Sequence, residues 1–240
     1  MEAEIRYLYH SGFSVKTERH FLIFDYYRDD PQNGGLADGV INPGEIRDLD
    51  TVVFASHSHP DHFSPKIFQL RNGVKHIRYV LSSQIHTKED ALRIRAGETR
   101  DLGDLTVHAL KSTDTGAAFL VKTDGLCIYH AGDLNWWNWE GEPDADNERM
   151  ARQYKEQIDT LQGEAIDIAF VPVDPRLEGS SLLGIGYFMK TVGAARVIPM
   201  HAFGNTDYYE CLKSNPLTES YRNQIWFYQN RGEPMVFRKP

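Results

Sequence analysis

The sequence has little cysteine and no long apolar run. Only Cys127 and Cys211 occur among its 240 residues, which excludes a disulfide framework and a four-cysteine zinc site. No stretch approaches the roughly 18 consecutive apolar residues that a membrane helix needs. The first residues also lack the basic and apolar segments of a signal peptide. We therefore expect a cytoplasmic protein that does not associate with membranes.

The sequence also has fewer basic than acidic residues. The chain has 26 Lys and Arg against 34 Asp and Glu, a formal net charge of −8, and no long basic cluster. Proteins that bind DNA or RNA usually carry a strongly basic surface. We therefore expect a small-molecule substrate and no nucleic-acid partner. The sequence does not decide whether the protein is a monomer or a homo-oligomer.

Apolar residues are plentiful and are arranged in alternating strand and helix patterns. The 41% hydrophobic content is enough for a large core, and the alternation indicates one α/β domain over residues 1–240 with mixed sheets and helices outside. Strands are expected at residues 5–10, 13–16, 21–25, 51–55, 78–81, 105–110, 117–122, 126–130, 166–173 and 196–200. Helices are expected near residue 64 and at 143–163 and 182–192, followed by a final hairpin of residues 224–228 and 235–238.

Histidine is concentrated in one short segment. Three of the ten histidines lie in His57-Ser58-His59-Pro60-Asp61-His62, directly after the expected strand at 51–55. In extended chain His57 and His59 point to the same side, and a turn into a helix at Pro60 would deliver Asp61 and His62 from a second direction. This arrangement suits two neighbouring metal ions, although it could also be a polar turn rich in histidine.

Other expected strands also end in residues that can bind metals. Asp133 follows residues 126–130, Asp174 follows 166–173, and His201 follows 196–200. Each could be an ordinary turn carboxylate or core histidine if taken alone. Together with the histidine cluster, they predict a site at one edge of the sheets.

Through His57-x-His59-x-Asp61-His62, Gly132-Asp133 and His201, the sequence resembles the metallo-β-lactamase superfamily. The opening His10-Ser11-Gly12-Phe13 is most similar to its lactonase-like branch, which includes L-ascorbate-6-phosphate lactonase. The resemblance implies a four-layer αββα sandwich of two mixed β-sheets with helices on the outside. It also implies a metal-dependent hydrolase that uses a metal-activated water on a small ester, lactone or phosphoester.

The resemblance further implies two divalent metal ions, zinc in the usual case. One would be held by His57 and His59 and the other by Asp61, His62 and His201, with Asp133 between them. Asp61 and Asp133 are the candidate catalytic residues, because a carboxylate beside the ions can orient the nucleophile and pass on its proton.

One histidine that is usual in the superfamily is missing here. The segment where it is expected, residues 111–116, contains Asp114 instead. Asp114 is one candidate replacement ligand; a single-metal site, or a ligand such as His86 or His130, is the alternative. A carboxylate ligand would move the metal preference from zinc towards manganese or iron.

Four residues are candidates for substrate binding. Trp136 and Trp137 follow Asp133 closely enough to stack on a substrate, or else they anchor the next helix. Arg176 could bind a phosphate or carboxylate, or pair with an acidic residue of the chain. His10 could face the cleft or be an ordinary strand residue.

Two other functions compete with hydrolysis of small molecules. The chain could be a metal-binding module without catalysis, such as a sensor, because one usual ligand is absent. It could also be a nuclease or phosphodiesterase of the same superfamily, which the charge of −8 disfavours.

Overall fold

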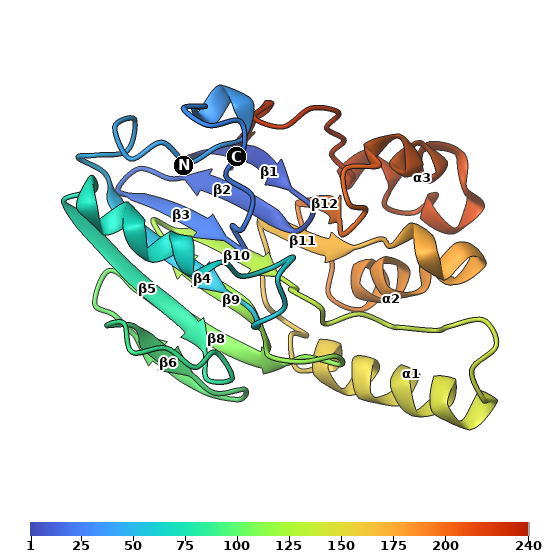
Figure 1. Ribbon diagram of the computed structural model, residues 1–240. Helices are drawn as coiled ribbons and strands as arrows, with labels where there is room; N and C mark the ends of the chain where they lie inside the picture. The colour runs from blue at the N-terminus through green and yellow to red at the C-terminus, as the bar shows by residue number, and fades with distance from the viewer. Residues whose placement is uncertain (240) are drawn as a thin grey trace.

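The computed structural model describes residues 1–239 and contains two mixed β-sheets. The first sheet has the strand order β13-β1-β2-β3-β4-β5-β6 (Figure 1). Its first three pairings are antiparallel and its last three are parallel. The strands are β1 (Glu2–Tyr9), β2 (Gly12–Lys16), β3 (His20–Phe24), β4 (Asp50–Ala55), β5 (His76–Ser82), β6 (Leu92–Ile94) and β13 (Pro234–Arg238).

The second sheet has the strand order β12-β11-β10-β9-β8-β7. Here β10, β11 and β12 run parallel to one another, and β7 to β10 form an antiparallel meander. The strands are β7 (Thr99–Asp101), β8 (Leu105–Lys111), β9 (Ala117–Thr123), β10 (Leu126–His130), β11 (Ile168–Pro172) and β12 (Arg196–Met200).

Helices cover the outer faces of the sheets. The longest, α1, begins after Pro143 with two acidic residues in its first turn, where they complement the helix dipole, and buries Tyr154 and Ile158. Within residues 1–239, no helix is long and apolar enough to cross a membrane. The α-helices are α1 (Asp144–Asp159), α2 (Leu183–Thr191) and α3 (Cys211–Ser214), and the 3-10 helices are η1 (Leu36–Asp38), η2 (Pro65–Asn72), η3 (Pro175–Ser180), η4 (Thr206–Glu210), η5 (Pro216–Thr218) and η6 (Arg222–Gln224).

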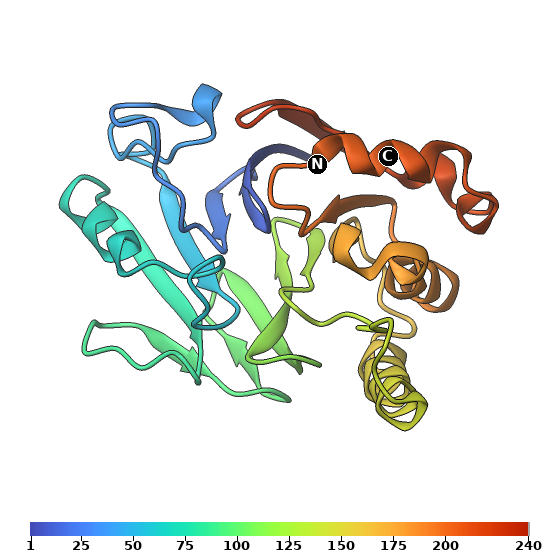
Figure 2. The same cartoon turned by 45° about the vertical axis from the view of Figure 1, so that its right-hand side comes forward.

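The core has two parts, because strands of the first sheet are buried on both faces. In β4, Val52 and Phe54 belong to the cluster between the sheets, while Val53 and Ala55 belong to a second cluster under η2. On the other side, α1 and α2 pack on the second sheet (Figures 1 and 2). The predicted αββα order is therefore confirmed, with a 3-10 helix and loops as the outer layer of the first sheet.

The predicted final hairpin is wrong. Residues 224–228 form no strand, and Ile225 makes only an isolated bridge to Val197 of β12. Pro199 has no N–H with which to continue a ladder, and its carbonyl accepts the Tyr228 hydroxyl instead. The last strand, β13, pairs with β1. The short strands β6 and β7 were not predicted, and the helix expected near residue 64 is the 3-10 helix η2.

Candidate metal centre

The candidate residues lie where strands of both sheets end. In the first sheet, β1 is followed by His10, β3 by Asp25, and β4 by the turn that carries residues 57–62. In the second sheet, Asp133, Asp174 and His201 follow β10, β11 and β12, and Asp114 lies in the turn between β8 and β9. Both sheets thus contribute to one site.

The sequence had suggested that Asp61 and His62 begin a helix. In the structure they belong to a turn. The backbone N–H groups of His62 and Phe63 both donate to the carbonyl of His59, at 3.0 and 2.9 Å. This tight turn folds His62 back onto His57, with 4.2 Å between ring centroids.

Two groups of side chains are each compact enough to hold a metal ion. In each group, one ligand-type atom per residue lies within 4.8 Å of the others. Asp133 contacts both groups: Oδ2 lies 3.4 Å from His57 Nε2, and Oδ1 lies 3.1 Å from Nε2 of His62 and of His201. The first group is His57, His59, Asp114 and Asp133, and the second is His10, Asp61, His62 and His201.

Buried polar atoms without partners converge in this place. Among residues 1–239, Oδ1 of Asp133 and four imidazole Nε2 atoms are buried and make no hydrogen bond; the histidines are His10, His57, His62 and His201. Burying a polar atom without a partner is costly, so such atoms are rare in folded proteins. Imidazole nitrogens and carboxylate oxygens are typical ligands of divalent transition metals, and the residues therefore fit a metal centre.

Two further carboxylates orient the histidines. Asp25 is buried, and its Oδ2 lies 2.8 Å from Nδ1 of His62. Asp174 is equally buried, and its Oδ2 lies 2.9 Å from Nδ1 of His201. A carboxylate that accepts the Nδ1–H leaves the Nε2 lone pair free for a metal ion.

Ser56 extends the support to His57. Its backbone N–H and its hydroxyl donate to the two oxygens of Asp25, at 2.7 and 2.6 Å. Since the hydroxyl proton is used in this way, Oγ accepts from Nδ1 of His57, 2.9 Å away. Asp25 therefore orients two histidines, one directly and one through Ser56.

Burial and these contacts set the pKa values of the carboxylate and imidazole groups at the site. Burial works to raise the pKa of Asp133, but the attraction of His62 and His201 outweighs it and holds that pKa well below its usual range. Burial lowers the pKa of His57 to about 4. Burial also works to lower the pKa of His201, but Asp133 and Asp174 outweigh it and raise this pKa to about 9.

The backbone at the site adopts uncommon conformations. His10, Asp25 and His201 have φ values of +56°, +44° and +79°, a region that residues other than glycine rarely occupy. Such residues cluster at functional sites, where tertiary contacts hold them in place. Gly132 has φ +51°, and a Cβ there would lie 2.6 Å from the Cβ of Ser56, so glycine is needed just before Asp133.

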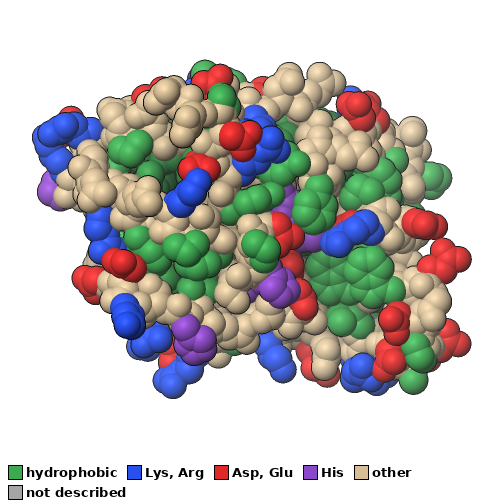
Figure 3. Space-filling view, in the orientation of Figure 1, with side chains coloured by type: hydrophobic (Ala, Val, Ile, Leu, Met, Phe, Trp, Pro, Cys, Tyr) green, Lys and Arg blue, Asp and Glu red, His purple; other side chains and the backbone are tan. Residues whose placement is uncertain are grey.

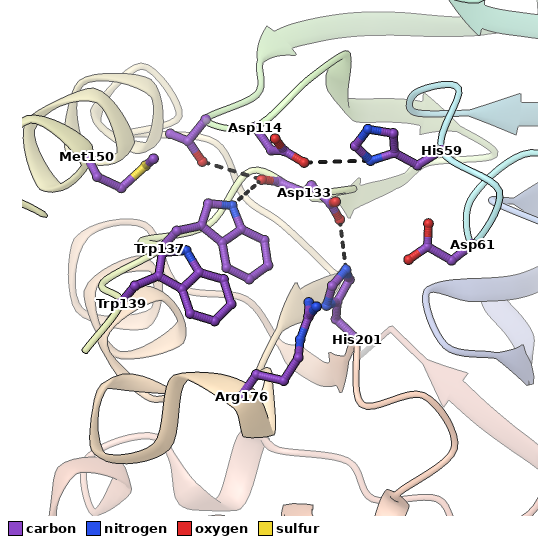
Figure 4. Close-up of a pocket in the computed structure, with 10 residues that line it drawn as sticks. His59, Asp61, Asp114, Asp133, Trp137, Trp139, Met150, Arg176 and His201 are labelled. Carbon is purple, nitrogen blue, oxygen red and sulfur yellow. Dashed lines mark hydrogen bonds and ion pairs between the residues drawn. The ribbon is translucent and has the colours of Figure 1, made fainter. Parts of the chain in front are cut away.

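A cavity of about 320 Å³ opens beside the metal-ligand groups (Figure 4). In the space-filling view, acidic and histidine side chains meet a broad apolar patch and a basic side chain on this face (Figure 3). The cavity is lined by His59, Asp61, Thr113, Asp114, Asp133, Trp137, Trp139, Met150, Arg176 and His201.

One wall of the cavity is aromatic. Trp137 and Trp139 are stacked with 5.9 Å between centroids and 4° between planes. The indole N–H of Trp137 donates to the carbonyl of Asp133 at 3.0 Å, which fixes this wall to the metal site. Arg176 packs between Trp139 and Phe203, and its Nε and Nη2 bind Asp174.

Two of the predicted substrate-binding residues lie elsewhere. Trp136 faces away from the cavity and packs against Tyr154 and Tyr187, because α1 and α2 need an apolar anchor there. Trp139 takes its place. His10 is buried at the metal-ligand groups and does not line the cavity. Arg176 lines the cavity and also pairs with Asp174, so the two interpretations of this residue are compatible.

The alternative ligands are not placed to bind a metal ion at this site. His86 is exposed. The ring nitrogens of His130 are both used, since Nε2 lies 2.8 Å from the carbonyl of Ser11 and Nδ1 accepts from Gly132 N–H. Asp114 is half-exposed, with Oδ2 3.8 Å from Nδ1 of His59, in the position that a replacement ligand would take. Asp25 and Asp174 follow apolar strands, as the ligands do, so the sequence marks them without revealing their role.

Comparison with known proteins agrees with this geometry. Residues 4–140 match the family described as "Beta-lactamase superfamily domain". A relative named UPF0173 metal-dependent hydrolase, from Pyrococcus abyssi, is 24% identical over 215 residues, which are 82% of this chain and 84% of the relative. A hydrolase of the same name from Pyrococcus furiosus is 25% identical over the same shares.

Solved structures share the fold at low identity. Igni18, a metallo hydrolase from Ignicoccus hospitalis, matches with a TM-score of 0.67 and 15% identity over 100% of both chains. CmlA, a diiron β-hydroxylase from Streptomyces venezuelae, matches with a TM-score of 0.63 and 12% identity over 99% of this chain and 54% of its own. These structures have the same two-sheet sandwich.

Proposed function

The chain belongs to the metallo-β-lactamase superfamily and is a metal-dependent hydrolase, and we propose that it uses two divalent metal ions to cleave a small anionic ester, lactone or phosphoester. The observation that carries this proposal is the convergence of the unpartnered, buried Nε2 atoms of His57, His62 and His201 around Asp133 at the base of a cavity.

Each of the two groups would bind one of the two ions. His57, His59 and Asp114 would hold one ion, Asp61, His62 and His201 would hold the other, and Asp133 contacts both sets. When bound, such ions activate water and polarise a carbonyl or phosphoryl oxygen of the substrate. In the first set Asp114 puts a carboxylate where the superfamily usually has an imidazole, and this exchange moves the metal preference from zinc towards manganese or iron.

The two catalytic candidates have different environments. Asp133 is buried, and its pKa is held low by His62 and His201, so it stays ionised and is suited to holding charge in place. The Asp61 side chain is 30% exposed and lines the cavity. We assign Asp61 the transfer of a proton at the carboxylate oxygen that the second ion would leave free, because the side chain lines the cavity.

The cavity wall favours an anionic substrate with an apolar part. Arg176 uses Nε and Nη2 for Asp174, while its Nη1 makes no hydrogen bond within residues 1–239. A guanidinium held in this way can bind a phosphate or carboxylate without losing much conformational entropy. Trp137 and Trp139 offer a flat apolar surface beside it.

Metal content is the first test. Elemental analysis of protein purified without chelator or metal-affinity resin should give two divalent ions per chain, with manganese or iron enriched over zinc. A single ion would contradict the division into two sites. Zinc alone at full occupancy would contradict the metal preference.

A substrate screen tests the rest. p-Nitrophenyl esters, lactones and phosphodiesters, each in a neutral form and in a form with an added carboxylate or phosphate, should show turnover that favours the anionic forms. The change Arg176→Gln should raise KM for the anionic forms only, and Arg238→Gln on the edge strand β13 is the matched control. Two bound ions without turnover of any of these compounds would contradict this substrate class and favour a non-catalytic metal-binding module.

A further inference from the structure

His10 lies inside the second group of metal ligands, yet no part of the assigned mechanism uses it. Its ring is fully buried and stacks on Phe203, with 3.9 Å between centroids. Its Nε2 makes no hydrogen bond within the described chain and lies 3.6 Å from Oδ2 of Asp61. By proximity alone, His10 would be a fourth ligand beside His62 and His201.

The hydrogen bonds at Nδ1 separate His10 from the other three histidines. A neutral imidazole carries one proton, so a nitrogen that donates leaves the other nitrogen with a free lone pair. Nδ1 of His62 faces Asp25, Nδ1 of His201 faces Asp174, and Nδ1 of His57 faces Ser56 Oγ. All three partners accept, and in its neutral form, the form that binds a metal ion, each of these rings therefore turns a lone pair at Nε2 towards the site.

His10 has the opposite pattern. Its Nδ1 lies 3.2 Å from the backbone nitrogen of Phe203, whose N–H can only donate. The lone pair of this ring is therefore at Nδ1, and the proton is at Nε2. An N–H group cannot coordinate a cation, whereas it can donate to a carboxylate oxygen.

We propose that His10 is not a metal ligand but a positioning residue. Its Nε2 lies 3.6 Å from Oδ2 of Asp61 in the structure, and the Nε2–H donates to this carboxylate and holds it in place once the second ion is bound. This inference rests on the proposed function, because it needs an ion at that site. Asp61 is only partly buried and stands on a turn. Carboxylates that bind metals are commonly held by a hydrogen bond to the oxygen that faces away from the ion.

Two substitutions separate the roles of the two ring nitrogens. His10→Asn keeps an acceptor for Phe203 N–H but cannot reach Asp61. His10→Gln extends an amide N–H to roughly the position of Nε2. His201→Asn is the comparison, because it removes a ligand that has the Nε2 lone pair.

The readouts are cobalt stoichiometry, the visible spectrum of the cobalt-loaded protein and the affinity of the second ion in competition with a chelator. We expect both His10 variants to bind as many Co²⁺ ions as the wild type, with unchanged absorption bands. His10→Asn should weaken the affinity for the second ion by about 10- to 100-fold. His10→Gln should recover most of this affinity. His201→Asn should lose one ion or change the bands.

A second measurement needs no stable variant. In the zinc-loaded wild-type protein, ¹⁵N-labelled histidine should show one ring in the metal site whose Nε2 is protonated and whose Nδ1 is neither protonated nor bound to metal. A wild type that binds two ions with Nε2 of every site histidine coordinated, or a His10→Gln variant that binds one ion fewer, would overturn the assignment of His10 alone. A wild type that binds no metal would overturn the proposed function and this inference together.

Discussion

The change Asp25→Asn tests whether a residue that touches no metal controls the metal site. Asp25 accepts three hydrogen bonds, two from Ser56 and one from His62 Nδ1. An asparagine can keep the bond from the Ser56 backbone through its single oxygen. Its NH₂ group would then face the Ser56 hydroxyl and His62 Nδ1. Both of these groups donate in the wild type and would have to accept in the variant.

The consequence for His62 is a change of tautomer. With a donor opposite Nδ1, the favoured neutral form carries its proton on Nε2, the nitrogen that faces Asp133 at 3.1 Å. Loss of an orienting carboxylate behind a metal-binding histidine typically costs about 10- to 100-fold in metal affinity. We expect a loss in this range for the second ion, equivalent to about 1.4–2.7 kcal/mol.

The assay is a metal titration in competition with a chromogenic chelator, together with a melting curve. Asp167→Asn is the matched control, because Asp167 is also buried and accepts from a backbone N–H, that of Cys127, but lies at the opposite ends of the strands. Asp25→Asn should weaken metal binding and the control should not. A folded Asp25→Asn variant with wild-type affinity for both ions would refute the orienting role of Asp25.

Three further predictions follow from the site and its surroundings. Asp114→Ala should lose one ion, whereas Asp114→His should keep two and, after loading with equal amounts of manganese and zinc, contain a larger share of zinc than the wild type. Elemental analysis measures both results, and retention of both ions in Asp114→Ala would show that Asp114 is not a ligand. Arg78 and His20 hold the pKa of Asp104 below its usual range, so the stability from this carboxylate is present above about pH 4 and is lost as the pH falls; the melting temperature of Asp104→Asn should therefore fall less than that of the wild type between neutral pH and pH 3. Chelation should lower the melting temperature of the loaded protein, and added manganese should restore it, because only the folded chain assembles the ligands; a melting curve unaffected by chelator would count against metal binding in the folded state.

The candidate ligands could be picked out from the sequence because their signal is local. His57, His59, Asp61 and His62 are close in sequence, and each later candidate directly follows an apolar strand. The fold class follows from the same alternation of strands and helices. These patterns depend on short-range periodicity, which a sequence displays openly.

The supporting residues were not predictable in the same way, because their roles depend on pairing between distant segments. Asp25 reaches Ser56 because β3 and β4 run parallel with Phe24 opposite Phe54. His10 looks like any other histidine after a strand, and only the N–H of Phe203, far along the chain, reveals which of its nitrogens carries the proton. The final hairpin failed for a related reason, since residues 235–238 pair with the distant strand β1 and not with residues 224–228, which make only an isolated bridge to β12.

One carboxylate contacts both the candidate metal centre and the arginine that faces the cavity. Asp174 accepts from His201 on one side and from Arg176 on the other, and it has a single negative charge to share between them. A change of charge at His201 therefore alters how firmly Asp174 holds the arginine that faces the cavity. Thermodynamic linkage makes this coupling reciprocal: an anion bound to Arg176 must change the affinity of the site at His201 by the same factor. If an ion binds at His201 and an anionic substrate binds at Arg176, as proposed, one side chain makes their binding cooperative.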